Sequence, residues 1–263
     1  NNGSMEDTTI FPHSDTLTGA IGSNAFFHNS EKAKNIISEI ENENIRLSSA
    51  FPFIQKDDKR VLFFPKPVVF DTWRLDKNSK IDFKKIKSVD FISKGVWEKS
   101  ITPEKWFDHS VCTLLQEGCM VCLKEEANFK GNETFFKKEV TPKVPITVDS
   151  LETDNNQTIY YQTDVFLFDG IDYITGYFFL AEYELNEDLK GFFEDKGIQA
   201  ITTFGIGGDR STGGGQITNI EKESFKWDLK NPNKWVNLAL LVPKSDDYYR
   251  KSRHKVLIRG GQN

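Results

Sequence analysis

The chain has 263 residues, of which 38% are hydrophobic and 28% are charged, and its formal net charge is −5 at pH 7. This length suits one large domain or two modest ones, and the acidic balance argues against a general nucleic-acid coat. No apolar run approaches the roughly 20 residues of a membrane helix, the N-terminus does not resemble a signal peptide, and three cysteines form no disulfide framework. The sequence therefore predicts a cytoplasmic globular protein without a membrane partner.

The first half of the chain predicts two helices followed by short strands. Helices are expected over 14–27, with Ser14 or Asp15 as the N-cap, and over 31–44. Strands are expected over 46–54 and 61–67, and both contain prolines that limit them. Another helix is expected from Pro103, because proline suits the first helical position after a Thr102 cap. Residues 124–143 are charged and irregular, which predicts a loop.

The second half predicts strands, one helix and a glycine-rich loop. The apolar runs 158–168 and 173–184 flank a turn sequence, Asp169-Gly-Ile-Asp, which is typical of a β-hairpin. Asn186 is expected to cap a short helix, and strands are expected over 216–227, 235–242 and 254–258. This order indicates the back end of a ferredoxin-like βαββαβ unit, with the glycine-rich loop between its second helix and its fourth strand.

The glycine-rich loop is the strongest chemical signal in the sequence. Six of the 18 glycines lie between Gly205 and Gly215, which predicts positive φ angles or a close backbone approach. Arg210 is its only cation, with Ser211 and Thr212 beside it, so the loop predicts a site for phosphate. It lacks the Gly-Lys-Ser/Thr of a Walker A loop and the third glycine of a dinucleotide fingerprint. The alternative is a surface connection without a ligand.

Charge is distributed unevenly along the chain. Residues 148–200 carry 12 acidic and 2 basic residues, whereas residues 201–263 carry 11 basic and 6 acidic ones. A basic tract in an acidic chain can form a local anion site, although charge runs are often only solvated faces.

Four stretches resemble the RAMP superfamily of CRISPR proteins. The loop from Gly205 to Gly215, between a helix and a strand, resembles the C-terminal glycine-rich loop of that superfamily. The stretches that begin at His13 (HSDTLTGAI), Leu47 (LSSAFPF) and Phe64 (FPKP) resemble the subunit-four family of the type III-A (Csm) effector complex. The resemblance covers about residues 10–220.

The resemblance implies an α+β fold with two ferredoxin-like (RRM-like) domains in tandem. The expected domains are 1–145, with insertions, and 146–263, which carries the glycine-rich loop. The family begins with a β-strand before the first helix and runs on at the C-terminus, so we expect the sequence to lack a segment at each end.

The resemblance also implies a non-catalytic subunit for antiviral defence, without cofactor or metal. Such a subunit grips the 5′ handle of the CRISPR RNA and contacts the large polymerase-like subunit and a backbone RAMP subunit. The residues expected to bind RNA are at the first helix start, in the second and third stretches and in the loop: His13, Ser14, Thr16, Ser48, Ser49, Lys66, Gly205, Gly207, Gly208, Arg210, Ser211, Thr212, Gly213 and Gly214. Weaker candidates are Lys84, Lys85 and Lys87.

Three alternatives remain open on the sequence alone. A helix N-terminus attracts phosphate, but Ser14 and Asp15 could simply cap it. A processing endoribonuclease could use His13 or His28 as an acid–base group, and a structural adaptor could pack the loop against a neighbouring protein. A fourth question concerns zinc, because four soft ligands lie within 14 residues: His109, Cys112, Cys119 and Cys122. Cysteines buried in the core are the commoner outcome.

Overall fold

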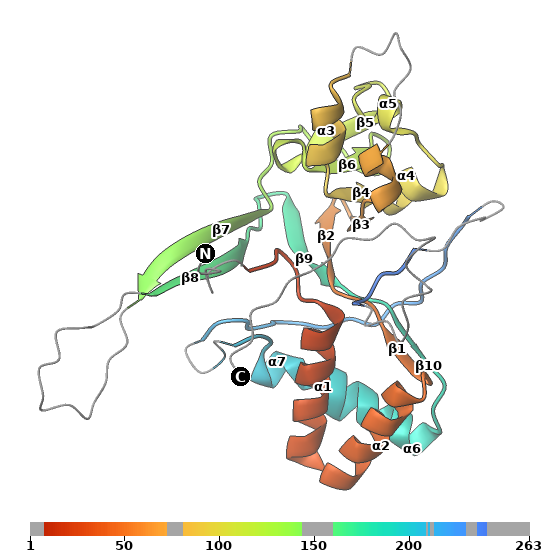
Figure 1. The fold of residues 1–263 in the computed structure, drawn as a ribbon, viewed down its shortest axis with the longest axis vertical. Coiled ribbons are helices and arrows are strands. Elements are labelled where there is room, and N and C mark those ends of the chain that lie inside the picture. Colours follow the sequence, from red (N-terminus) through yellow and green to blue (C-terminus); the bar gives the residue numbers. More distant parts are fainter. Residues whose placement is uncertain are drawn as a thin grey trace, which may run out of the picture.

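The computed structural model describes residues 8–72, 81–143, 160–208, 210, 213–229 and 236–240 (Figure 1). Its helices are α1 (Ser14–His28), α2 (Ser30–Glu41), η1 (Val68–Thr72), α3 (Phe83–Ser88), α4 (Lys94–Glu98), α5 (Pro103–Trp106), η2 (Gln116–Gly118), α6 (Glu187–Phe192), the π-helix η3 (Phe193–Gln199) and α7 (Ile201–Phe204). Its strands are β1 (Ile45–Leu47), β2 (Phe51–Lys56), β3 (Lys59–Pro65), β4 (Phe91–Ser93), β5 (Cys112–Leu115), β6 (Met120–Leu123), β7 (Phe136–Lys143), β8 (Tyr160–Leu167), β9 (Tyr173–Phe178) and β10 (Ala181–Tyr183).

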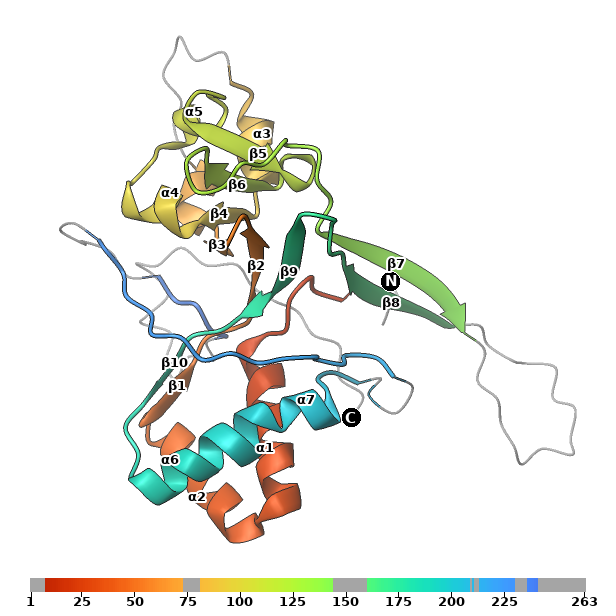
Figure 2. The same cartoon turned by 180° about the vertical axis from the view of Figure 1, so that it is seen from behind.

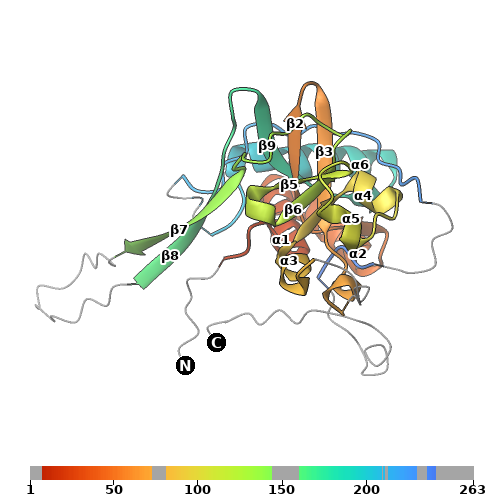
Figure 3. The ribbon, with the colours of Figure 1, turned by 90° about the horizontal axis from the view of Figure 1, so that it is seen from above.

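The strands form three sheets. The largest has the order β5-β6-β4-β3-β2-β9, and in it only the β4–β6 pair is parallel. β1 pairs with β10, and β7 pairs with β8 in a ribbon that projects from the body of the molecule (Figure 3). The mixed α+β class is therefore confirmed.

The two halves of the chain share their sheets. β9 pairs with β2 from Phe51↔Phe178 to Lys56↔Tyr173, and β10 pairs with β1. α1 also packs against η3, and the Asn24 side-chain amide donates to the Gly197 carbonyl at 3.3 Å in this contact. Two ferredoxin-like domains in tandem are therefore not confirmed, and the expected boundary near residue 145 does not separate two sheets.

The hairpin predicted between residues 158–168 and 173–184 is wrong. Both runs are strands, but β8 pairs with β7 and β9 pairs with β2. The turn sequence bends the chain from one sheet to another, and the Asp169 carboxylate fixes it by accepting from the Thr175 amide at 2.7 Å. An apolar run indicates a strand, but it does not specify the partner of that strand.

Three further predictions are wrong. Residues 136–143, expected to be a loop, form β7, whose side chains after Phe136 are exposed or half-buried. Residues 216–227, expected to be a strand, run without a ladder partner among the described residues. The strand expected over 235–242 is absent from its described part, 236–240, and residues 254–258 lie outside the described residues.

Helix positions agree better with the sequence. α1 and α2 occupy nearly the expected ranges, and the Asn186 side chain caps α6 by accepting from the Leu189 amide at 2.9 Å. α1, α2, α6 and η3 share an apolar core that includes Ile21, Ala25, Ala33, Ile36, Leu189 and Phe193. No helix within the described part of the chain is long and apolar enough to cross a membrane.

Candidate nucleic-acid interface

At the base of the glycine-rich loop, just after α7, two backbone segments come into close contact, and we call this contact the pinch. The Gly205 amide ends α7 by donating to the Ile201 carbonyl at 2.8 Å, and the Ile206 amide donates to the Gly215 carbonyl at 2.9 Å. A Cβ atom at Gly215 would lie 1.8 Å from the Ile206 carbonyl oxygen, and Gly205 and Gly215 have φ angles of 72° and 65°. The predicted need for positive φ and close approach is therefore confirmed.

The outer part of the loop is open. Gly207, Gly208 and Gly213 are exposed and have no heavy atom within 4 Å of an added Cβ. Arg210 is exposed, and its Cγ atom lies 3.5 Å from the Cβ position of Gly205, so its stem packs on the pinch. A guanidinium beside accessible glycine backbone can bind an anion. Ser211 and Thr212 lie outside the described residues.

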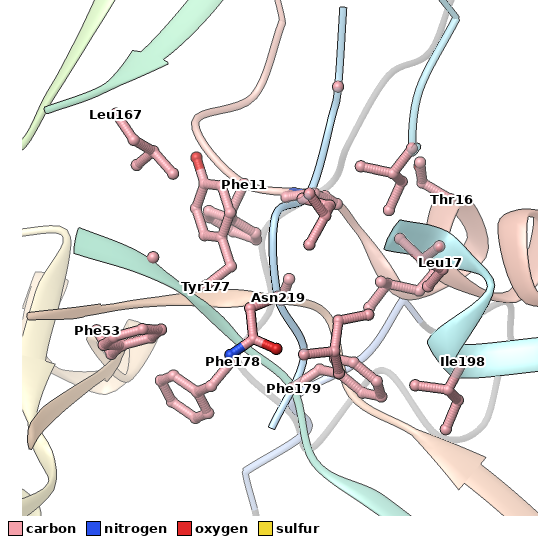
Figure 4. Close-up of a pocket in the computed structure, with 18 of the residues that line it drawn as sticks. Phe11, Thr16, Leu17, Phe53, Leu167, Tyr177, Phe178, Phe179, Ile198 and Asn219 are labelled. Atoms are coloured by element: carbon pink, nitrogen blue, oxygen red, sulfur yellow. The ribbon is translucent and has the colours of Figure 1, made fainter. Parts of the chain in front are cut away.

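A groove of about 2460 Å³ runs beside the loop (Figure 4). Its walls are the loop, the start of α1, the strands β8 and β9, and residues 216–226, which we call the strap. Figure 2 shows the strap, in blue, running across the molecule between α7 and β9. Thr16, predicted as an RNA contact, and Leu17 line the groove from α1.

Ion pairs fasten the strap to the rest of the molecule. The Arg60 guanidinium donates to Glu221 at 2.9 Å and to Glu223 at 2.6 Å, and it lies 5.0 Å from the centre of the Phe53 ring. The Gln199 side-chain amide also donates to the Ile220 carbonyl at 3.0 Å. The strap is therefore held from β3, through Arg60, and from η3.

A third ion pair joins Lys222 of the strap to Glu194 of η3 at 2.6 Å. Glu194 also accepts from the Tyr183 hydroxyl. The Lys222 ammonium and then the Tyr183 hydroxyl hold the pKa of Glu194 below its ordinary value, and Glu194 raises the pKa of Lys222. Both charges therefore persist at neutral pH.

The three predicted serines tie backbone segments together. Ser49 Oγ accepts from the Ser14 amide at 3.1 Å, Ser14 Oγ accepts from the Leu240 amide at 3.0 Å, and Ser48 Oγ accepts from the Leu180 amide at 2.8 Å. All three serines are buried. The helix start that was expected to attract phosphate is therefore occupied by Ser49, and the N-cap residue is His13 rather than Ser14 or Asp15.

Lys66 is also engaged inside the protein. Its side chain is buried, and its ammonium donates to the Ile86 carbonyl at 2.7 Å, near the end of α3. This position does not favour a phosphate contact, and the same holds for the three serines. We therefore leave these four residues out of the RNA contact proposed below.

The sequence-predicted sites are brought together only in part. The glycine-rich loop and Thr16 border the same groove, whereas Lys66 follows β3 and contacts α3, the helix that carries Lys84, Lys85 and Lys87. His13 packs against Phe11, with ring centres 5.0 Å apart. Of the predicted residues, those of the loop and Thr16 therefore form one candidate site, and the others lie outside it.

The cysteines lie in the core of the large sheet. Cys112 and Cys122 belong to separate apolar clusters, and burial raises the pKa values of Cys112 and Cys119 to about 12. Within the described residues, no three His, Cys, Asp or Glu side chains are grouped so as to hold a metal ion.

Sequence reasoning missed two features near the loop. One is the Arg60 contact to the strap, which joins residues more than 160 positions apart. The other is a cluster of three rings, Phe27, His28 and Phe204, at the ends of α1 and α7. The sequence contained two signals for this cluster. One was a Phe-His pair at the end of a predicted helix, and the other was a phenylalanine immediately before the loop.

Comparison with known proteins identifies a solved structure of the same fold and others that are similar to this chain. No protein-family model and no curated protein matches the chain. A chain of the Csm3–Csm4 subcomplex of the type III-A CRISPR–Cas interference complex matches with a TM-score of 0.53 and 19% identity, over 75% of this chain and 60% of that chain. A chain of the Csm1–Csm4 cassette in complex with AMPPNP matches with a TM-score of 0.45 and 18% identity, over 80% of this chain and 64% of that chain.

The chain thus spans about 60% of the length of the Csm3–Csm4 chain that it matches. The resemblance predicted by the four sequence stretches is confirmed at the level of the fold, and this protein has the fold of a chain in a type III-A Csm subcomplex.

Proposed function

We propose that this protein is a non-catalytic RNA-binding subunit of a type III-A (Csm) effector complex and grips the 5′ handle of the CRISPR RNA. The observation that carries the proposal is the shared fold with a chain of the Csm3–Csm4 subcomplex. The loop supports it, because it combines the exposed Arg210 with exposed glycines at which an added Cβ would meet no heavy atom within 4 Å, Gly207, Gly208 and Gly213.

The loop would bind the RNA backbone rather than read its sequence. Arg210 neutralises a phosphate, and its stem is positioned by the pinch at Gly205. Amides of the outer glycines donate to phosphate oxygens, because they have no Cβ atom that would hold the RNA away. The buried serines support this site by holding α1 against β1, β2 and residues 238–240.

The substitution Arg210→Ala tests this contact. We expect weaker binding of single-stranded handle RNA and a shallower salt dependence, with the slope of log affinity against log salt falling by about 0.7 for one lost phosphate contact. Titrations of RNA at several salt concentrations measure both quantities. The matched control is Arg46→Ala, because Arg46 is an exposed arginine on β1, at the other end of the α6–α7 helix (Figure 1). Equal affinities and slopes for Arg210→Ala and the wild-type protein would refute the contact.

The proposed partners are the large polymerase-like subunit and a backbone RAMP subunit. The similar solved chains come from a Csm3–Csm4 subcomplex and a Csm1–Csm4 cassette, which suggests the same kinds of neighbour. Affinity purification of the tagged protein from cells that express the whole system should recover both subunits and a CRISPR RNA. Incubation with repeat RNA should leave that RNA intact, and cleavage would identify a processing endoribonuclease instead.

A further inference from the structure

A small aromatic cluster lies on the surface next to the loop. The ring centre of Phe27 is 5.0 Å from that of Phe204 and 5.5 Å from that of His28, and both neighbours are strongly tilted to it, by 62° and 88°. Phe27 nevertheless remains 74% exposed. Its ring is held in place by two others but is not covered.

The cluster is continuous with the candidate RNA site. Phe204 is the last residue of α7 and directly precedes Gly205, against which the Arg210 stem packs. Figure 1 shows α7 lying against α1. The exposed ring of Phe27 thus contacts the residue that immediately precedes the loop, and the loop carries an arginine. Proteins use aromatic rings together with cationic side chains to hold single-stranded RNA.

We propose that Phe27 is a stacking platform for one unstacked base of the RNA whose backbone the glycine-rich loop holds. This inference rests on the proposed function. Phe204 and His28 act as positioning residues, because they fix the ring of Phe27 against the end of α7. Stacking needs no hydrogen bond to the base edge, so the platform adds affinity without selecting one base strongly.

The size of the cluster favours a base over a protein neighbour. A stable protein interface buries roughly 1,200–2,000 Å², whereas one phenylalanine offers about 150–250 Å². Phe26, which is 41% exposed, is the other large apolar residue in this part of α1 that is exposed among the described residues. A single base is a better match to one open ring.

Substitutions at Phe27 separate stacking from simple apolar contact. Because Phe27 is mostly exposed, its replacement should leave the fold intact, which thermal unfolding checks. Phe27→Ala and Phe27→Leu should weaken binding of single-stranded RNA about fivefold to 150-fold. Phe27→Trp should retain the wild-type affinity. The control is Ile171→Ala, because Ile171 is fully exposed in the turn before β9, away from α7.

A fluorescent base locates the stacked position. Short single-stranded RNAs with 2-aminopurine at each position in turn should show quenching at one position, and Phe27→Ala should abolish that quenching. Unchanged RNA affinity for Phe27→Ala, alongside weaker binding by Arg210→Ala, would overturn the platform but keep the proposed function. The same conclusion would follow if Phe27→Ala only reduced recovery of another subunit. Absence of RNA binding by the wild-type protein would overturn both.

Discussion

At the scale of single residues, the loop depends on two glycines that meet across its base. Gly215 combines a positive φ angle with a backbone oxygen 1.8 Å from its Cβ position. Any side chain there must open the pinch, and opening it would also move Arg210, whose stem packs on Gly205. The geometry of the proposed phosphate site therefore rests on the two glycines at its base.

The substitution Gly215→Ala should therefore destabilise the loop by about 2 kcal/mol or more, through backbone strain and the clash with the Ile206 carbonyl. Faster hydrogen exchange of the Ile206 amide and a lower melting temperature are the expected signs. Gly208→Ala is the matched control, because Gly208 has no atom within 4 Å and no positive φ. It should change stability by less than about 0.5 kcal/mol. Equal exchange rates for the two variants would contradict the pinch.

Residue type alone gave an unreliable guide to the other predicted contacts. Lys66 was expected to bind RNA because it lies in the FPKP stretch, but its ammonium donates to the Ile86 carbonyl near the end of α3. The serines around Ser49 satisfy amides that would otherwise be buried without partners. A polar side chain in a sequence does not reveal whether its partner is a ligand or the protein backbone.

At the scale of elements, the strap is held across the groove mainly by side chains. Arg60 binds Glu221 and Glu223, and Lys222 binds Glu194, while the strap has no strand partner among the described residues. Exposed ion pairs contribute little individually and are weakened by salt. The strap is therefore the wall of the groove that should detach most easily.

Removing the Arg60 guanidinium should expose the strap to protease. Arg60→Met keeps an apolar stem on Phe53 but loses two ion pairs, together about 0.5–2 kcal/mol. Trypsin should then cut after Lys222 roughly twofold to thirtyfold faster, because cleavage follows the population of the opened strap. The difference should shrink at high salt. Arg46→Met, which loses an exposed pair on β1, should cleave at the wild-type rate. If Arg60→Met is also cleaved at the wild-type rate, the Arg60 ion pairs do not hold the strap.

Local elements could be predicted from the sequence, but their pairing could not. The Asn186 cap and the proline at the first helical position, Pro103, depend on neighbouring residues and mark real helix starts. β7 was missed because its ribbon projects from the body, so most of its side chains lack the alternation of a half-buried strand. The hairpin prediction failed because β8 pairs with the preceding strand, β7, and β9 pairs with β2, which lies far away in the sequence.

At the scale of the whole molecule, the chain is one interleaved unit. β9 pairs with β2 over six residues, β10 pairs with β1 over three, and η3 packs on α1. The loop and its aromatic neighbour also come from both halves, since Phe27 belongs to α1 and Phe204 to α7. The proposed RNA site therefore requires both halves to be folded together.

Separate production of residues 1–145 and 146–263 tests this interdependence. Either half alone leaves one edge of the large sheet unpaired and an apolar face of α1 or η3 uncovered, so neither should show a cooperative thermal transition. Produced together, the halves should copurify through a tag on one of them and recover a single transition, because the β2–β9 pairing and the α1–η3 packing can form between chains. Binding of single-stranded RNA should return only in the combined sample. Independent folding of both halves would instead support two tandem domains, and it would show that folding does not require the β2–β9 pairing.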